Sequence, residues 1–334
     1  MSARLRRLLV PFVPLYRIAL GFRELRLRRG WEPIRRLRFP VISIGNLSTG
    51  GAGKTPLAIA LVQALSARGL EVDVLSRGYG RQAAAAARVR VDGSAEQFGD
   101  EPLLIARKAC VPVYVARERY DAGLLAEADG DAGRSRIHIL DDGFQHRQLH
   151  RDIDVVMLNR SDWRDRLLPA GNLREPLGAA RRATVLAIPA EDGDLGDELR
   201  ASDWRGPIWR LHRRMEAPPV AGPVVAFCGI ARPDQFFDGL EAAGLRVAER
   251  VAFRDHHRYA ARDLERLHNA ALTRGAKALV TTEKDHVRLE SLARWGSGAV
   301  SVLTASLRVE IEDESAVMSW LTDRLRDTEV RPTL

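Results

Sequence analysis

Short apolar runs alternate with longer amphipathic segments along much of the chain. The apolar runs predict buried strands at residues 41–44, 71–75, 111–115, 137–140, 153–158 and 184–188. The segments at 57–65 and 103–108 predict helices between some of these strands. Strands that alternate with helices are typical of a mostly parallel sheet with helices on both faces. This part of the chain is therefore predicted to have an α/β fold.

A second α/β pattern begins near residue 223. It predicts strands at 223–228, 247–253 and 278–281 and helices at 234–243 and 261–274. The chain has 334 residues, which is more than one hydrophobic core usually serves. Residues 189–221 contain acidic, Trp- and Pro-containing stretches and are predicted to form a connection. We therefore expect a larger core domain over 39–216 and a smaller C-terminal α/β domain over 217–330.

The first 38 residues differ from the rest in charge. Residues 1–40 contain eleven Arg and two Glu, a net charge of +9, whereas the whole chain carries +8. The basic character therefore belongs to an N-terminal arm, 1–38. A nucleic-acid enzyme more often spreads positive charge over its folded body, so we expect no nucleic-acid partner.

The arm also contains the longest apolar run near the N-terminus, at residues 8–16. This run is too short to span a bilayer, and it includes Pro11 and Pro14. Because arginines alternate with large apolar residues, we predict an uncleaved amphipathic helix that lies on an anionic membrane surface. The alternative is a helix that packs only against the protein itself.

One polar segment lies between the first predicted strand and the first predicted helix. Residues 46–56 read Asn-Leu-Ser-Thr-Gly-Gly-Ala-Gly-Lys-Thr-Pro, which in this context indicates a phosphate-binding loop. Lys54 is expected to reach the β- and γ-phosphates of a nucleotide, and the Thr55 hydroxyl to bind Mg²⁺. Ser48 stands where the general pattern has glycine. Backbone freedom is then expected from the later glycines, Gly50, Gly51 and Gly53.

Several polar side chains follow other predicted strands. Asp141 and Asp142 end an apolar strand, where a carboxylate can hold Mg²⁺ opposite such a loop, and the sequence does not say which of them does so. A transferase also needs a base for its acceptor hydroxyl, and the best candidates lie in 99–101 and 255–257. Arginines near strand ends favour an anion-binding cleft: Arg77, Arg81, Arg117, Arg119 and Arg174.

The order of these motifs is more specific than any one of them. They occupy residues 45–47, 53–56, 76–80, 99–102, 141–146, 168–171, 173–175, 255–256 and 282–285. In this order they resemble the tetraacyldisaccharide 4'-kinases, the lipid A 4'-kinases of Gram-negative bacteria. The resemblance extends from the arm to about residue 290, and Ser48 agrees with a family whose loop carries its glycines late.

The resemblance implies an activity and a set of site residues. It implies ATP-dependent phosphorylation of the 4'-hydroxyl of a tetraacylated glucosamine disaccharide 1-phosphate, in a P-loop NTPase-like fold whose C-terminal domain closes the cleft. It implies that Asp100, paired with His256, is the catalytic base and that Lys54 assists transfer. The matching nucleotide and Mg²⁺ positions are Gly50, Gly51, Ala52, Gly53, Lys54, Thr55, Asp141, Asp142 and Gln145. The matching lipid-substrate positions are Arg77, Tyr79, Arg174 and Glu175.

The resemblance also implies a location, the cytoplasmic face of the bacterial inner membrane, with the protein attached peripherally through its arm. The partners expected are the lipid substrate and the anionic membrane surface, with no obligate protein partner. Two other classes of protein share parts of this pattern. One is a membrane-partition ATPase or GTPase without a lipid acceptor, and the other is a nucleic-acid-dependent NTPase.

Overall fold

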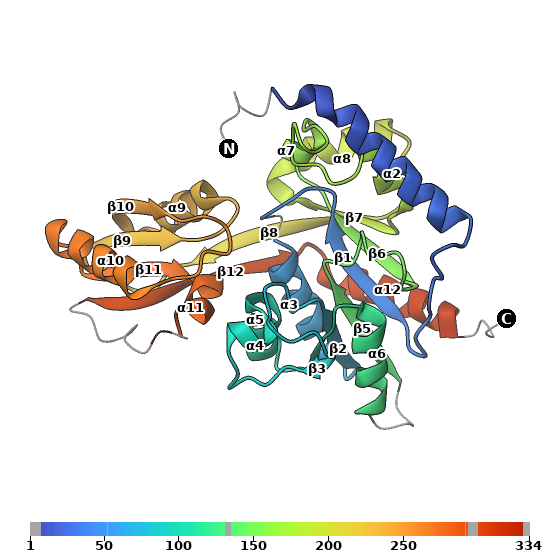
Figure 1. Ribbon diagram of the computed structural model, residues 1–334, viewed down its shortest axis with the longest axis horizontal. Coiled ribbons are helices and arrows are strands. Elements are labelled where there is room, and N and C mark those ends of the chain that lie inside the picture. Colours follow the sequence, from blue (N-terminus) through green and yellow to red (C-terminus); the bar gives the residue numbers. More distant parts are fainter. Residues whose placement is uncertain (1–7, 52, 131–134, 291, 293–299, 330–334) are drawn as a thin grey trace.

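The computed structural model describes residues 8–51, 53–130, 135–290, 292 and 300–329 of the chain (Figure 1). Its strands form one sheet in the order β10-β9-β11-β12-β8-β7-β6-β1-β5-β2-β4-β3. Neighbouring strands are parallel except in the pairs β8–β12 and β3–β4, which are antiparallel. The predicted α/β fold with a mostly parallel sheet is confirmed.

The elements have the following bounds. The strands are β1 (Val41–Asn46), β2 (Glu71–Ser76), β3 (Ala87–Arg88), β4 (Val113–Val115), β5 (Arg136–Asp141), β6 (Ile153–Met157), β7 (Val185–Pro189), β8 (Ile208–Glu216), β9 (Pro223–Cys228), β10 (Arg246–Ala252), β11 (Ala278–Thr282) and β12 (Ser301–Ile311). The α-helices are α2 (Val13–Arg28), α3 (Lys54–Ser66), α4 (Ala95–Phe98), α5 (Asp100–Ala109), α6 (Arg119–Ala128), α7 (Arg160–Trp163), α8 (Gly193–Ala201), α9 (Pro233–Ala242), α10 (Ala261–Thr273), α11 (Glu283–Leu289) and α12 (Glu314–Glu329). Short 3-10 turns are η1 (Val10–Phe12), η2 (Leu177–Arg182) and η3 (Ala190–Asp192).

One prediction about the order of elements is wrong. The segment 189–221 is no simple connection, because it contains α8 and the nine-residue strand β8. Trp209 and Leu211 are buried while Arg210 and His212 are exposed, which is the period-two pattern of a half-covered strand. Acidic and proline-rich flanks hid that short alternation. The strand β12 and the helix α12 were also not predicted individually.

Apolar side chains cover both faces of the part of the sheet that β1–β8 form. Helix α3 packs on one face of the sheet, where Leu57, Leu61 and Leu65 join buried residues of β1, β2 and β5. Helix α6 covers the other face near β4, and α8 covers it near β6 and β7. We call β1–β7 with α3–α8 the N-lobe.

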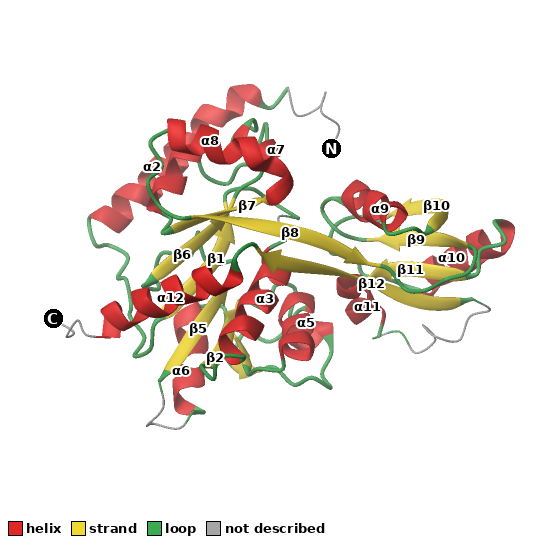
Figure 2. Ribbon diagram, turned by 180° about the vertical axis from the view of Figure 1, so that it is seen from behind, coloured by secondary structure: helices red, strands yellow, loops and turns green. Residues whose placement is uncertain are grey.

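Two long strands connect this part to the rest of the chain. Strands β8 and β12 pair over residues 211–216 and 306–311, and they run from the N-lobe toward β9, β10 and β11 (Figure 2). We call β9–β11 with α9–α11 the C-lobe. Its faces are covered by α9, through Phe236 and Phe237, and by α10, through Leu264 and Leu267.

The last helix returns to the N-lobe. Val317, Met318 and Leu321 of α12 are buried in the same cluster as residues of α3. The region 217–330 therefore contributes to two cores, and its description as a separate C-terminal domain stays a prediction.

The described part of the arm is helical and has two apolar faces. Val13, Tyr16 and Leu20 pack against the apolar cluster that contains α8 residues. The opposite face exposes large side chains at helical spacing: Leu8, Phe12, Leu15, Ile18, Phe22 and Leu25. Within the described residues, no helix is both long and apolar enough to cross a bilayer.

A buried histidine links three elements of the N-lobe through two carboxylates. His138 of β5 is fully buried, with Nδ1 2.7 Å from Asp73 Oδ1 on β2 and Nε2 3.6 Å from Glu127 Oε1 on α6. Burial opposes a charged imidazole, but the two carboxylates outweigh it and raise the pKa of His138 to about 9. The raised pKa stabilises the folded state fully below pH 6.5, and this contribution is lost as pH rises through about 9.

We expect His138→Gln to flatten the dependence of stability on pH. Between pH 6.5 and about 9.5, the free energy of unfolding should fall by roughly 3 kcal/mol more in the wild type than in this variant. Denaturant unfolding at several pH values measures the difference. His212→Gln, at an exposed imidazole, is the matched control. Equal pH dependence in the wild type and His138→Gln would contradict a charged, buried His138.

Candidate active site

The carboxyl ends of β1, β2 and β5 lie side by side in the sheet and open into one cavity. The cavity has a volume of about 1610 Å³. Its N-lobe wall includes the glycine-rich loop and the end of β5, and its C-lobe wall includes residues 230–232, 255–256 and 282–284. The motifs that are scattered in sequence are therefore brought together, as parallel strands predict.

The glycine-rich loop needs its glycines for two reasons. Gly50, Gly51 and Gly53 have φ values of +82°, +45° and +84°, which side chains with a Cβ rarely adopt. A Cβ on Gly50 would lie 2.5 Å from Ala231 Cβ, and one on Gly51 would lie 2.9 Å from Arg232 Cγ. The C-lobe therefore approaches the loop closely. Ala52 lies outside the described residues.

Ser48 has an ordinary structural role at the start of this loop. It is buried and forms an isolated antiparallel bridge with Leu173. Its carbonyl accepts a hydrogen bond from Arg174 Nε at 3.0 Å, and its hydroxyl accepts one from Asn46 at 3.2 Å. Extended backbone at this point needs no glycine, which explains the departure from the general loop pattern.

Lys54 and Arg174 converge on Asp142. Lys54 Nζ lies 3.4 Å from Asp142 Oδ1 and donates to Asn46 Oδ1 at 3.1 Å. Arg174 binds both carboxylate oxygens of Asp142, at 3.0 and 3.2 Å. Burial opposes ionisation of Asp142, but the Lys54 ammonium and the Arg174 guanidinium hold its pKa well below the usual range.

Asp141 differs from its neighbour. Its side chain is buried, Oδ2 is 3.5 Å from the Ser76 hydroxyl, and Oδ1 has no hydrogen-bond partner among the described residues. Burial, followed by the carboxylates of Glu101 and Asp142, raises the pKa of Asp141 to about 7. A buried carboxylate oxygen without a partner is suited to a hard cation. Thr55 lines the same cavity.

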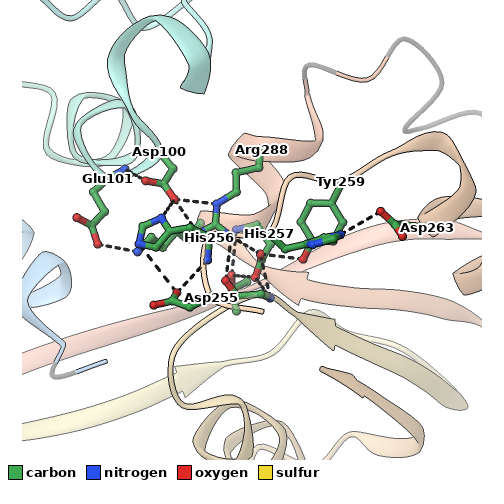
Figure 3. A network of polar contacts seen from close by, with 12 residues as sticks. Asp100, Glu101, Asp255, His256, His257, Tyr259, Asp263 and Arg288 are labelled. Carbon is green, nitrogen blue, oxygen red and sulfur yellow. Dashed lines mark hydrogen bonds and ion pairs between the residues drawn. The ribbon is translucent and has the colours of Figure 1, made fainter. Parts of the chain in front are cut away.

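Across the cavity, Asp100 and His256 meet (Figure 3). Asp100 begins α5 of the N-lobe, and His256 lies between β10 and α10 of the C-lobe. His256 Nδ1 is 3.1 Å from Asp100 Oδ2, while Nε2 lies 4.0 Å from Asp255 Oδ1. His256 has a left-handed φ of +54°, and its ring lies 5.1 Å from that of Tyr79. The pairing of a carboxylate with an imidazole, suggested by the sequence, is present in the structure.

The other predicted positions differ in their access to the cavity. Arg77, Tyr79 and Gln145 line it, and Gln145 Nε2 donates to Asn46 O at 2.9 Å. Glu175 is 7% exposed, and its carboxylate accepts a hydrogen bond from Arg182 at 2.6 Å instead of lining the cavity. The structure therefore gives Glu175 a contact within the protein.

Two cationic side chains near Asp100 were not assigned from the sequence. Lys284 lines the cavity, with Nζ 2.6 Å from Glu101 Oε1. Arg288 contacts Asp100 directly at 2.7 Å. Burial opposes ionisation of Asp100, but the hydrogen bond from His256 and the charges of Lys284 and Arg288 hold its pKa well below the usual range. Lys284 belongs to a recognised motif, whereas nothing in the spacing marked Arg288.

Comparison with known proteins identifies the same family as the order of the motifs. The family model described as tetraacyldisaccharide-1-P 4'-kinase matches residues 5–326. The tetraacyldisaccharide 4'-kinase of Koribacter versatilis is 38% identical in an alignment of 319 residues that covers 92% of this chain and 96% of that protein. The enzyme of Aeromonas hydrophila with the same name is 41% identical in an alignment of 313 residues that covers 90% of each chain.

A solved structure is similar over most of the chain. It is a crystal structure of LpxK from Aquifex aeolicus, described as an "apo" form in complex with ATP, with a TM-score of 0.73 and 32% sequence identity. The match covers 96% of this chain and 99% of the other. The resemblance drawn from the motifs is thereby confirmed, and the chain belongs to the tetraacyldisaccharide-1-P 4'-kinase family of kinases.

Proposed function

We propose that this protein transfers the γ-phosphoryl group of ATP to the 4'-hydroxyl of a tetraacylated glucosamine disaccharide 1-phosphate. The product is the bis-phosphorylated lipid A precursor. Family membership supports the acceptor, and the ATP complex of the related Aquifex aeolicus protein supports the donor. One observation carries the proposal: the phosphate-binding loop and His256, whose imidazole contacts the Asp100 carboxylate, line one cavity.

The proposed reaction is direct in-line transfer. Backbone N–H groups of the glycine-rich loop and the Lys54 ammonium hold the β- and γ-phosphates and stabilise their charge. Arg77, Tyr79 and Arg174 bind the lipid headgroup, and Gln145 contributes to nucleotide binding. The Asp100–His256 pair orients the acceptor hydroxyl and accepts its proton. Most of the acceleration would come from positioning and from charge stabilisation.

The residues present also fit a bound Mg²⁺. Within the described residues there is no cluster of three or more His, Cys, Asp or Glu that could hold a metal alone. Mg²⁺ typically takes one or two carboxylates and completes its shell with phosphates and water. We propose the unpartnered Oδ1 of Asp141 and the Thr55 hydroxyl as its protein ligands. Asp142, which contacts Lys54 and Arg174, would add a second negative charge near the ion. When bound, the ion would neutralise charge on the β- and γ-phosphates.

The arm supports a peripheral membrane location, which we propose to be the cytoplasmic face of the bacterial inner membrane. The exposed apolar face of α2 is flanked by arginines, a combination that binds anionic lipid surfaces. The lipid substrate resides in such a surface. The reaction as proposed needs neither a protein partner nor nucleic acid.

The activity is tested with purified protein, MgATP and a tetraacyldisaccharide 1-phosphate in detergent. We expect a lipid product heavier by one phosphate, with the new group at the 4' position by NMR. Release of free phosphate without a phosphorylated lipid would favour the ATPase alternative and reject the kinase.

Asp100→Asn should lower kcat by about 10²–10⁴-fold, because the pair would lose its charged member. Nucleotide affinity should stay near that of the wild type. Steady-state kinetics and fluorescent-nucleotide binding measure the two effects. Asp92→Asn, at an exposed ion pair, is the control. Turnover near the wild-type value in Asp100→Asn would remove Asp100 from the proposed role.

Lys54→Ala should weaken nucleotide binding by about 10- to 100-fold, because a charge-assisted contact to phosphate is lost. Calorimetric titration with MgATP measures the dissociation constant. Lys277→Ala, on the C-lobe surface, should bind as the wild type does. Unchanged affinity in Lys54→Ala would show that the loop does not hold the phosphates in the way proposed.

Replacing Ile18 and Phe22 together by Ser should reduce binding to anionic vesicles by more than about 10-fold, because two large apolar contacts are lost. Sedimentation with vesicles measures binding, and kcat of the double variant in detergent should equal that of the wild type. The control is the pair Leu124→Ser and Leu272→Ser, which alters exposed apolar residues elsewhere. Equal vesicle binding by both double variants would contradict a membrane role for α2.

A further inference from the structure

A buried arginine holds the Asp100 carboxylate from the C-lobe side (Figure 3). Arg288 belongs to α11, and both its Nε and its Nη2 lie 2.7 Å from Asp100 Oδ2. The two side chains are only 8% and 6% exposed. A contact that buries two charges contributes strongly only when its hydrogen bonds are well formed, and its loss is correspondingly costly.

The C-lobe fixes Arg288 independently of Asp100. Arg288 Nη1 donates to Asp285 Oδ1 at 2.8 Å and to Gly229 O at 2.9 Å. Asp285 is fully buried and accepts further hydrogen bonds from the Tyr259 hydroxyl at 2.8 Å and the Thr282 hydroxyl at 2.6 Å. The guanidinium is thus presented to Asp100 in a defined orientation.

The Asp100 carboxylate is in turn constrained at both oxygens. Oδ1 accepts a hydrogen bond from Glu101 N at 2.9 Å, and Oδ2 is shared by Arg288 and by His256 Nδ1 at 3.1 Å. A carboxylate that accepts from Nδ1 fixes the imidazole tautomer and leaves Nε2 as the nitrogen that can accept a proton. The orientation of His256 therefore depends on the orientation that Arg288 gives to Asp100.

We propose that Arg288 is a positioning residue for phosphoryl transfer, which holds Asp100 against His256 across the contact between the two lobes. The inference rests on the proposed function, because the pair matters only if it receives the acceptor proton. Arg288 also keeps a positive charge beside the pair, so it favours the ionised carboxylate. The other charged groups that face the pair are Lys284 of the C-lobe, Glu101 of α5 and Asp255 beside His256.

A purely structural role for Arg288 makes a different prediction. Helix α5 is also joined to the residue that follows α11, because Arg107 Nη1 and Glu290 Oε2 lie 2.7 Å apart. Arg107 is seven residues from Asp100 on α5, which is roughly 10 Å along a helix. Arg107→Gln therefore removes a contact between the same two regions of the chain without touching the pair, and it is the matched control.

The experiment compares pH profiles of kcat/KM for the wild type, Arg288→Gln, Arg288→Lys and Arg107→Gln. We expect Arg288→Gln to lower kcat by about 10- to 100-fold because the pair is misaligned. Its acidic limb should move to higher pH by about one unit, since removal of a positive charge lets the pair retain its proton longer. Arg288→Lys should keep the limb in place and lose less kcat. Arg107→Gln should resemble the wild type.

An unmoved acidic limb in Arg288→Gln, together with a kcat equal to that of Arg107→Gln, would overturn the inference. Thermal unfolding and nucleotide binding establish that each variant is folded. If Arg288→Gln does not fold, Arg288→Met takes its place, and an unmoved acidic limb with a kcat equal to that of Arg107→Gln would equally overturn the inference. A wild type that binds nucleotide but phosphorylates no lipid rejects the proposed function instead, so the two failures are distinguishable.

Discussion

The contact between Asp100 and the C-lobe is the interaction on which the rest of the site depends. Asp100 begins a helix of the N-lobe, whereas His256 and Arg288 belong to the C-lobe. The loop that would hold the nucleotide belongs to the N-lobe and is approached closely by the C-lobe, through Ala231 and Arg232. In the proposed mechanism, neither lobe alone has both the phosphate site and the proton acceptor. The long strands β8 and β12 connect the two lobes, because β8 pairs with β7 and β12 pairs with β11.

The electrostatics of the cavity follow from unequal pairing of its carboxylates. Asp142 and Asp100 each face two or more cations, and their pKa values are held low despite burial. Asp141 is more deeply buried than Asp142 and lies near the carboxylates of Glu101 and Asp142, and its pKa is raised. Cations of the protein therefore stabilise the charges of Asp100 and Asp142, while Oδ1 of Asp141 has no hydrogen-bond partner among the described residues and can accept a ligand.

Much of this arrangement could be predicted from the sequence, because it depends on local patterns. The loop around Lys54 and the aspartates after β5 follow apolar strands, and parallel strands bring their carboxyl ends together. Strand β8 was missed because its alternation is short. Arg288 was missed because its importance comes from a contact with a residue 188 positions earlier, which no spacing reveals. Glu175 shows the reverse case, since its motif was visible but its carboxylate pairs with Arg182.

The central claim is that Asp100 and His256 act as one unit across the two lobes. A double-mutant cycle on kcat with Asp100→Asn, His256→Gln and the double variant tests it most directly. Residues that act as a unit are strongly non-additive, so the double variant should be about as slow as the slower single variant. If the two losses multiply instead, the residues act independently, and a base assembled across the lobes is contradicted.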